Sequence, residues 1–163
     1  MKITIFTTGG TIDKDYAPGA GTYNFEISEP AAKRILEIAN PGFQYDIRVL
    51  LKKDSLDMTD ADRQRIYDAC KNAANNKIII THGTDTMIET ARKLSGIKNK
   101  AIVLVGSSKP AKFSDSDAHF NLGTATGGIS VLTNGIYIAM NGEISAWNMV
   151  MKNPKTGKFE RIR

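Results

Sequence analysis

Short apolar runs alternate with longer amphipathic stretches along the chain, and this alternation is its main structural signal. Runs rich in isoleucine, valine and leucine predict buried strands at residues 3–7, 46–51, 77–80, 101–105 and 136–140. Apolar side chains at helical spacing predict helices at residues 28–39, 59–74, 85–94 and 117–132. The Asn141-Gly142 pair is a strong turn signal, and it predicts that residues 143–147 return as a sixth, antiparallel strand.

The regular exchange of strands and helices is typical of a parallel sheet covered by helices on both faces. We therefore predict a single three-layer α/β/α domain over residues 1–163, with a mostly parallel sheet. Right-handed crossovers favour a flavodoxin-like strand order, 2-1-3-4-5, with the antiparallel strand as a hairpin at the C-terminal end. In that order the first and third strands are neighbours, and such a switch point is where ligand crevices of open α/β sheets lie.

The connecting segments carry further expectations. Ser28 is expected to cap the first helix, with Pro30 tolerated in its first turn. Thr59 and Asp62 have the spacing of a capping box for the second helix. Residues 13–25 predict a long loop that acts as a functional lid, and the basic residues after Trp147 predict a solvated tail.

The composition narrows the class of protein without indicating its activity. Apolar residues make up 41% of the chain and charged residues 24%, as in ordinary globular proteins. The net charge of +5 comes with no nucleic-acid-binding module, and no apolar run is long enough to span a membrane. Cys70 is the only cysteine, which excludes an intrachain disulfide. Because no signal peptide is visible either, we expect a cytoplasmic protein.

Two glycine-containing turns follow the first and third predicted strands. They are Thr8-Gly-Gly-Thr-Ile12 and Thr81-His-Gly-Thr-Asp-Thr86. Each presents a hydroxyl, on Thr11 and on Thr84, beside backbone N–H groups that favour an anion or a developing oxyanion. Taken alone, each threonine could equally cap its own turn. The first turn also suggests a phosphate cradle, but it lacks both GxGxxG and the lysine of a P-loop.

The residues around these turns could take several different catalytic roles. A threonine hydroxyl becomes an effective nucleophile only when a base takes its proton. Asp85 is a weak base that could orient a lysine or bind a substrate ammonium, and Lys152 is one candidate among many lysines. His82 looks like a base at first sight, yet a hydrogen-bonded supporting role is the favoured interpretation. No cluster of metal-ligating residues is visible.

The two turn motifs together resemble those of the bacterial-type L-asparaginase family. Further matches are Val105-Gly-Ser-Ser-Lys-Pro110, Ser116-Asp-Ala-His-Phe-Asn-Leu122 and Met140-Asn141. The resemblance covers nearly the whole chain but only the N-terminal domain of the usual two-domain enzyme, so the sequence is similar to the short-chain form. It implies an amidohydrolase that converts L-asparagine to L-aspartate and ammonia without a metal or organic cofactor. It also implies a homodimer or a larger homo-oligomer.

The resemblance implies roles for the catalytic residues. Thr11 matches the first nucleophilic threonine, which attacks the amide carbon and forms an acyl-enzyme. Thr84 matches the second essential threonine, and Asp85 and Lys152 complete its triad-like set. Lys152 lies at the family's distance after the Met-Asn pair of the fifth strand.

Substrate contacts follow from the same match. Ser55 aligns with a serine that holds the substrate α-carboxylate, Asp85 with the acid that holds the α-ammonium, and Ser107 with a position whose backbone carbonyl meets the amide. A lid tyrosine assists the nucleophile, and Tyr23 matches it best, with Tyr16 as the competitor. The implied substrate-binding set is Gly10, Asp54, Ser55, Gly83, Thr84, Asp85 and Ser107.

Two departures from the family pattern reduce the contacts available to the substrate amine. Leu56 stands where the family has a glutamine that contacts this amine. The acidic residue that a neighbouring subunit's C-terminal domain lends to the amine is absent with that domain. These losses favour a rival hypothesis of a different class, a non-catalytic flavodoxin-like module whose crevice binds a small acid or amide.

Overall fold

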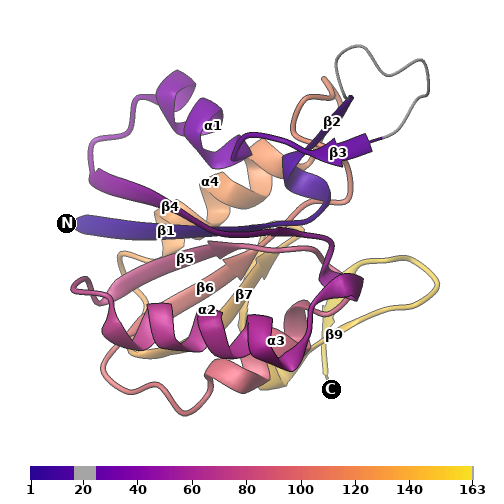
Figure 1. Cartoon of the computed structure of the whole chain (residues 1–163). Coiled ribbons are helices and arrows are strands. Elements are labelled where there is room, and N and C mark those ends of the chain that lie inside the picture. The colour runs from indigo at the N-terminus through magenta and orange to yellow at the C-terminus, as the bar shows by residue number, and fades with distance from the viewer. Residues whose placement is uncertain (17–24, 163) are drawn as a thin grey trace.

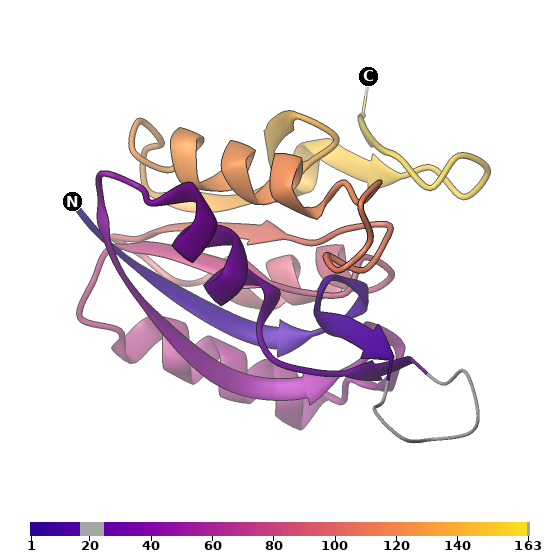
Figure 2. The same ribbon diagram turned by 90° about the horizontal axis from the view of Figure 1, so that it is seen from above.

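The computed structural model describes residues 1–16 and 25–162, and a six-stranded sheet runs through its centre (Figures 1 and 2). The strands are β1 (Lys2–Gly9), β4 (Gln44–Lys53), β5 (Lys77–Thr81), β6 (Ala101–Val105), β7 (Gly135–Met140) and β8 (Glu143–Ala146). They lie in the order β4-β1-β5-β6-β7-β8. The first five in this order pair in parallel, and β8 returns antiparallel to β7. The predicted order 2-1-3-4-5 and the antiparallel sixth strand are both confirmed.

Helices cover both faces of the sheet and give the predicted three layers. Their bounds are α1 (Ala31–Ala39), α2 (Asp60–Asn72), α3 (Met87–Leu94) and α4 (Ala118–Gly128). Figure 1 shows α1 and α4 on one face and α2 and α3 on the other. Ile78 and Ile80 pack with α2 and α3, whereas Ile79 packs with α1 and α4. All three side chains are fully buried, as expected for a central parallel strand covered on both sides.

The start of α2 is tied to the end of β4. The predicted capping box is present: Thr59 Oγ1 accepts the Asp62 N–H at 3.2 Å, and the Asp62 carboxylate accepts the Thr59 N–H at 2.9 Å. Lys53 donates to the same carboxylate at 2.8 Å. The hydrogen bond from Lys53, reinforced by that from Thr59, lowers the pKa of Asp62 to about 2. These contacts fix both ends of the short connection that contains Ser55.

Several helix ends differ from the prediction; α2, for example, ends at Asn72 and not at residue 74. α3 begins at Met87, with Thr86 in the cap position, and not at Asp85. α4 ends at Gly128 and not at residue 132. Its last residues include Gly127 and Gly128, whose low helix propensity explains the early end.

The prediction that Ser28 caps α1 is wrong. Pro30 occupies the cap position and makes no side-chain cap hydrogen bond. The missing acceptor comes from a distant residue: Asp13 Oδ1 accepts the Ala31 N–H at 2.8 Å. The backbone carbonyl of Asp13 also accepts the Ser28 N–H at 2.8 Å. A carboxylate that follows β1 therefore takes the place of the local serine.

The described residues at both ends of the predicted 13–25 loop are regular structure. The 3₁₀ helix η1 (Thr11–Asp13) leads into β2 (Lys14–Tyr16), which pairs antiparallel with β3 (Phe25–Ile27). In Figure 1 this ribbon extends beyond the main sheet at the end where β1 stops. Tyr23, the favoured lid tyrosine, lies outside the described residues, so its role stays a prediction.

The prediction of a solvated C-terminal tail is also wrong. After η3 (Trp147–Met149), β9 (Val150–Lys152) and β10 (Phe159–Arg161) form an antiparallel hairpin. Val150 and Phe159 are buried and belong to the apolar cluster on the α2 and α3 side of the sheet. Each strand has three residues and lies among lysines, so its apolar positions are too few to predict a strand from the sequence.

Asp13 makes stability depend on pH in a testable way. Burial raises the pKa of Asp13 to about 7 from its usual 3.8, despite the opposing hydrogen bond from Ala31 and the charge of Lys52. Between these pH values the folded chain binds a proton that the unfolded chain lacks, so this residue's contribution to the unfolding free energy falls as pH rises. We expect Asp13→Asn, which keeps the acceptor, to match wild type at pH 4 and to exceed it by about 2–4 kcal/mol at pH 8.

Urea unfolding of both proteins across this pH range measures the difference. All other groups titrate in both proteins, so subtraction isolates Asp13. Parallel curves from pH 4 to pH 8 would contradict the expectation.

Candidate active site

Three turns meet at the carboxyl ends of the strands through close backbone contacts. Gly10 has φ +82°, and a Cβ placed on it would lie 2.4 Å from the backbone nitrogen of Gly83. A Cβ placed on Gly83 would lie 2.7 Å from the Cβ and Oγ of Ser55. Side chains do not approach so closely, so only glycine permits these contacts. The turns that carry Thr11, Thr84 and Ser55 are therefore pressed directly against one another.

The sheet register sets up this meeting. Thr7 of β1 pairs with Thr81, the last residue of β5, and β1 continues only to Gly9. Beyond that pair, Thr8 Oγ1 donates to the Thr81 carbonyl at 2.8 Å, and the Gly10 N–H donates to the Lys53 carbonyl at 2.9 Å. Hydrogen bonds therefore continue past the strand ends and hold the first turn against both neighbouring strands.

Lys152 reaches this junction from the C-terminal hairpin. Its Nζ donates to Thr84 Oγ1 at 3.0 Å and to Asp85 Oδ1 at 2.6 Å, across about 67 residues of sequence. The lysine side chain is 27% exposed, and Thr84 is half-buried. An amine within hydrogen-bond distance of a hydroxyl, with a carboxylate beside it, is the arrangement of a base, a hydroxyl and an orienting group.

The Ser55 turn is held from two sides. Ser55 is buried, its carbonyl accepts the Thr86 hydroxyl at 2.7 Å, and its Oγ accepts the Thr86 N–H at 3.4 Å. Asp54 Oδ1 accepts the Leu56 N–H at 3.3 Å and so closes η2 (Ser55–Asp57). Lys14 donates to Asp54 Oδ2 at 2.7 Å, and this hydrogen bond holds the pKa of Asp54 below its usual range.

The turn after β6 joins the same cluster. A Cβ on Gly106 would lie 2.4 Å from the carbonyl oxygen of His82. Ser107 follows at once; it is buried, and its Oγ donates to the Lys109 carbonyl at 2.5 Å. The side chain of Ser107 is thus occupied within its own turn.

His82 supports the Thr84 turn. Its Nδ1 lies 2.7 Å from the Gly83 carbonyl, which can only accept, so Nδ1 carries the proton. Its Nε2 then accepts the Thr90 hydroxyl at 2.8 Å. Complete burial lowers the pKa of His82 to about 4, so the ring is neutral near pH 7. The geometry agrees with the supporting role that we favoured over a catalytic base.

The structure brings together most of the predicted site. Thr84, Asp85 and Lys152 are in contact, and the glycine contacts join the Thr11, Thr84 and Ser55 turns. Tyr16, the competing lid tyrosine, lies in β2, and its ring stacks on Phe113 with 6.5 Å between ring centroids.

Sequence reasoning missed two residues that support the site. Lys14 couples the β2–β3 ribbon to Asp54, and Asp13 couples the Thr11 turn to α1. The partners lie about 40 and 18 residues apart, so no local pattern links them.

Three further features of residues 1–16 and 25–162 concern metal ligands, the free thiol and membrane-spanning helices. No group of three histidine, cysteine, aspartate or glutamate side chains there could hold a metal ion. Burial raises the pKa of the Cys70 thiol to about 12, so this residue is an inert core side chain. No helix in these ranges combines the length and apolarity needed to cross a membrane.

Comparison with known proteins agrees with this geometry. The family model described as "Asparaginase, N-terminal" matches residues 2–160, and the chain therefore belongs to the asparaginase family through that domain. The thermostable L-asparaginase of Thermococcus kodakarensis is a close structural neighbour, with a TM-score of 0.87 and 31% identity. The match covers 99% of this chain and 51% of that one.

Curated relatives indicate more than one substrate within the family. A glutamyl-tRNA(Gln) amidotransferase subunit from Methanococcus vannielii is 32% identical over 149 residues, which are 88% of this chain and 35% of the relative. The glutaminase-asparaginase of Pseudomonas fluorescens biotype A is 27% identical over 98% of this chain and 48% of the relative. This chain thus spans half or less of these curated relatives.

The close contact of the turns predicts that Gly10 cannot be replaced. We expect Gly10→Ala to lower the unfolding free energy by about 2–4 kcal/mol, because a Cβ both clashes with Gly83 and strains the positive φ. Gly42→Ala is a matched control, since a Cβ on Gly42 meets nothing within 4 Å. Urea unfolding of both variants measures the effect. Equal stability of Gly10→Ala and Gly42→Ala would show that the turns are not in contact.

Proposed function

We propose that this chain hydrolyses L-asparagine to L-aspartate and ammonia, with Thr11 as the nucleophile. The contact of Lys152 with Thr84 and Asp85 is the observation that carries the proposal. It supplies a basic amine beside a hydroxyl, in a cluster of turns that contains a second threonine. Membership of the asparaginase family supports the reaction class, which is amide hydrolysis.

In the proposed first half-reaction, Thr11 Oγ1 attacks the side-chain amide carbon. A bond forms between Oγ1 and this carbon, the carbon–nitrogen bond breaks, and ammonia leaves with the proton that the hydroxyl gives up. The product is an acyl-enzyme ester. The predicted lid tyrosine, Tyr23, assists the proton transfer. Backbone N–H groups of the glycine turns are the candidates for stabilising the oxyanion.

The second half-reaction uses water. Lys152 in its neutral form takes a proton through the Thr84 hydroxyl, and the activated water cleaves the ester. Thr11 recovers its hydroxyl, and L-aspartate leaves. Asp85 orients Lys152, to which it is already bonded at 2.6 Å, and it is the candidate acceptor for the substrate ammonium.

The proposed substrate contacts lie on the same turns. Ser55 holds the α-carboxylate, and Asp54 keeps the Ser55 turn closed through its bond to the Leu56 N–H. Gly10 and Gly83 allow the substrate to approach the backbone closely. The backbone carbonyl of Ser107 receives the amide N–H groups.

The proposed setting of the enzyme combines the family resemblance with the composition of the chain. Residues 1–163 form one catalytic domain of the asparaginase N-terminal type, which works without a metal or organic cofactor. It acts as a homodimer or a larger homo-oligomer in the cytoplasm, without nucleic-acid or membrane partners. The buried free thiol of Cys70 is compatible with a reducing compartment.

Two other candidates have support of their own. L-Glutamine is a rival substrate, because one relative is named a glutaminase-asparaginase. A non-catalytic module that binds a small acid or amide is the rival class. It is favoured by Leu56, which is 70% exposed beside Ser55 and offers no hydrogen bond to a substrate amine.

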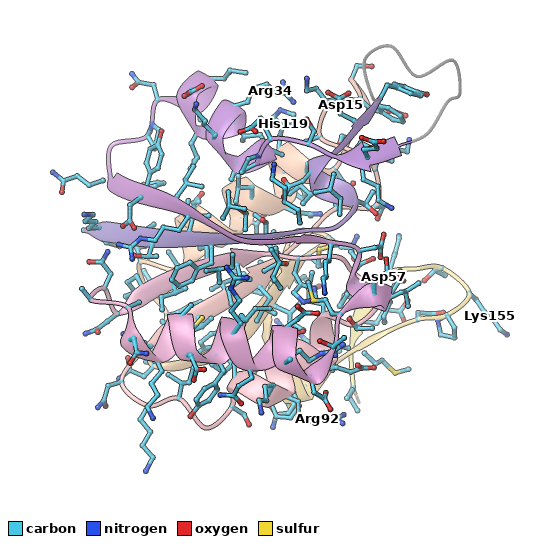
Figure 3. All side chains as sticks on the ribbon, viewed as in Figure 1. Asp15, Arg34, Asp57, Arg92, His119 and Lys155 are labelled. Carbon is cyan, nitrogen blue, oxygen red and sulfur yellow. The ribbon has the colours of Figure 1, made fainter. Side chains whose placement is uncertain are left out.

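Ammonia release from L-asparagine and L-glutamine tests the function. We expect Thr11→Ala, Thr84→Ala and Lys152→Met each to lower kcat by roughly two to four orders of magnitude, since each removes a nucleophile or its activator. Lys155→Met is the matched control, because Figure 3 shows Lys155 in the loop of the same hairpin, pointing away from the sheet. Wild-type turnover should rise with pH, since only a neutral lysine is a base.

A wild-type protein that binds L-asparagine and releases no ammonia would support the binding module. Near-normal turnover of Thr11→Ala would remove Thr11 from its assigned role.

The apolar side chain of Leu56 predicts weak recognition of the substrate amine. We expect a KM for L-asparagine of about 1 mM, at the upper end of ordinary enzymes. Succinamic acid lacks only the amine, and its kcat/KM should be lower by about 100-fold or less, as for one exposed ion pair and a hydrogen bond. Leu56→Gln should improve L-asparagine selectively. A wild-type preference for asparagine above ~10⁴ would show that another residue completes the amine site.

A further inference from the structure

The hairpin that carries Lys152 stands outside the main sheet. Among the residues that the structure describes, β9 and β10 pair only with each other. The position of the lysine amine against Thr84 therefore depends on whatever fixes this small ribbon to the domain. Val150 and Phe159 provide apolar packing, which is not directional. An ion pair between Arg161 and Glu143, 3.3 Å apart, is exposed and contributes little.

One side chain, that of Asn141, makes a hydrogen bond to the hairpin next to Lys152. Asn141 Oδ1 accepts the backbone N–H of Phe159 at 3.0 Å. Phe159 lies directly opposite Lys152 in the register of the hairpin. The hydrogen bond from Phe159 to Asn141 therefore fixes the backbone at the level of the lysine.

Asn141 is itself held by a buried amide. It follows β7 with φ +55°, and its N–H donates to Asn121 Oδ1 at 3.1 Å. Asn121 is fully buried, and its Nδ2 donates to the Gly106 carbonyl at 3.0 Å and to Asp117 Oδ2 at 2.9 Å. The Asp117 carboxylate in turn accepts the N–H of Ser108 at 2.9 Å. A continuous chain of hydrogen bonds thus joins the turn after β6 to the hairpin.

We propose that Asn141 is a positioning residue that sets Lys152 against Thr84, with Asn121 as its anchor in the core. The kinetic consequence rests on the proposed function, whereas the tie to the hairpin does not. Asn141 binds Phe159, which lies opposite Lys152 in the hairpin, so we expect it to act by positioning the lysine. Loss of the tie should lower kcat and leave substrate binding nearly intact, because misplacement of a catalytic group penalises the reaction step.

The simpler interpretation is that Asn141 is present only because asparagine tolerates the positive φ of the β7–β8 turn. Two substitutions separate the interpretations. Asn141→Gly adopts the same backbone conformation without strain but removes the acceptor. Asn141→Asp keeps an acceptor for the Phe159 N–H. Asn99→Gly is the matched control, since Asn99 also has a positive φ (+61°) and lies before β6, away from the hairpin.

The experiment measures ammonia release from L-asparagine and hydrogen exchange of the Phe159 amide in all four proteins. We expect Asn141→Gly to lose ~10–100-fold in kcat with KM changed less than ~3-fold. Its Phe159 amide should exchange at least ~10-fold faster, while the amide of Ile79 in the central strand keeps its protection. Asn141→Asp should stay within ~3-fold of wild type on both measures, and Asn99→Gly should match wild type.

Three results would overturn the proposal. They are wild-type kcat in Asn141→Gly, unchanged exchange of its Phe159 amide, and an Asn141→Asp protein as impaired as the glycine variant. If wild type releases no ammonia from any amide, the proposed function fails separately. Exchange of the Phe159 amide then decides whether Asn141 holds the hairpin.

Discussion

The contact between the backbones of Gly10 and Gly83 is the constraint on which the rest of the site depends. No side chain fits between these turns, and a further contact of the same kind joins Gly83 to Ser55. Because β1 and β5 run in parallel register up to the Thr7–Thr81 pair, residues far apart in sequence arrive in one small volume. The turns are therefore positioned by the sheet, and their geometry is set before any substrate binds.

Lys152 is positioned by a part of the fold other than the main sheet. Thr11, Thr84 and Ser55 follow strands of the sheet directly, whereas Lys152 sits on the β9–β10 hairpin, outside the main sheet. Its placement depends on two buried apolar side chains and on the relay from Asn121 through Asn141 to Phe159. A lysine on such a ribbon can be moved without disturbing the sheet, so the domain separates what holds the proposed nucleophile from what holds the proposed base.

Much of the fold was predictable because its signals are local. The strand of residues 101–105 has the predicted bounds, and the Thr59–Asp62 capping box was read from spacing alone. The threonine turns were found because glycine and hydroxyl residues after a buried strand are a local pattern. The Ser28 prediction failed because the deciding contact is not local. A serine before a helix is usually its cap, but here Asp13, which follows β1, accepts the Ala31 N–H instead. The β9–β10 hairpin was not predicted because Val150 and Phe159 are too few to form a recognisable alternation of apolar and polar residues.

Local sequence patterns are enough to predict the order of strands and helices, the two covered faces of the sheet and the turns that carry Thr11 and Thr84. Periodicity, turn residues and motif spacing are properties of neighbouring residues, and they act before the chain is folded. The resemblance named Lys152 as the partner of Thr84, but the contact itself depends on the folded hairpin, as do the Asp13 contact with the first turn of α1 and the Lys14 contact with Asp54 on the tertiary structure. Those pairs join residues 18 to 68 positions apart, and their distances follow from strand register and backbone packing, which no local pattern encodes.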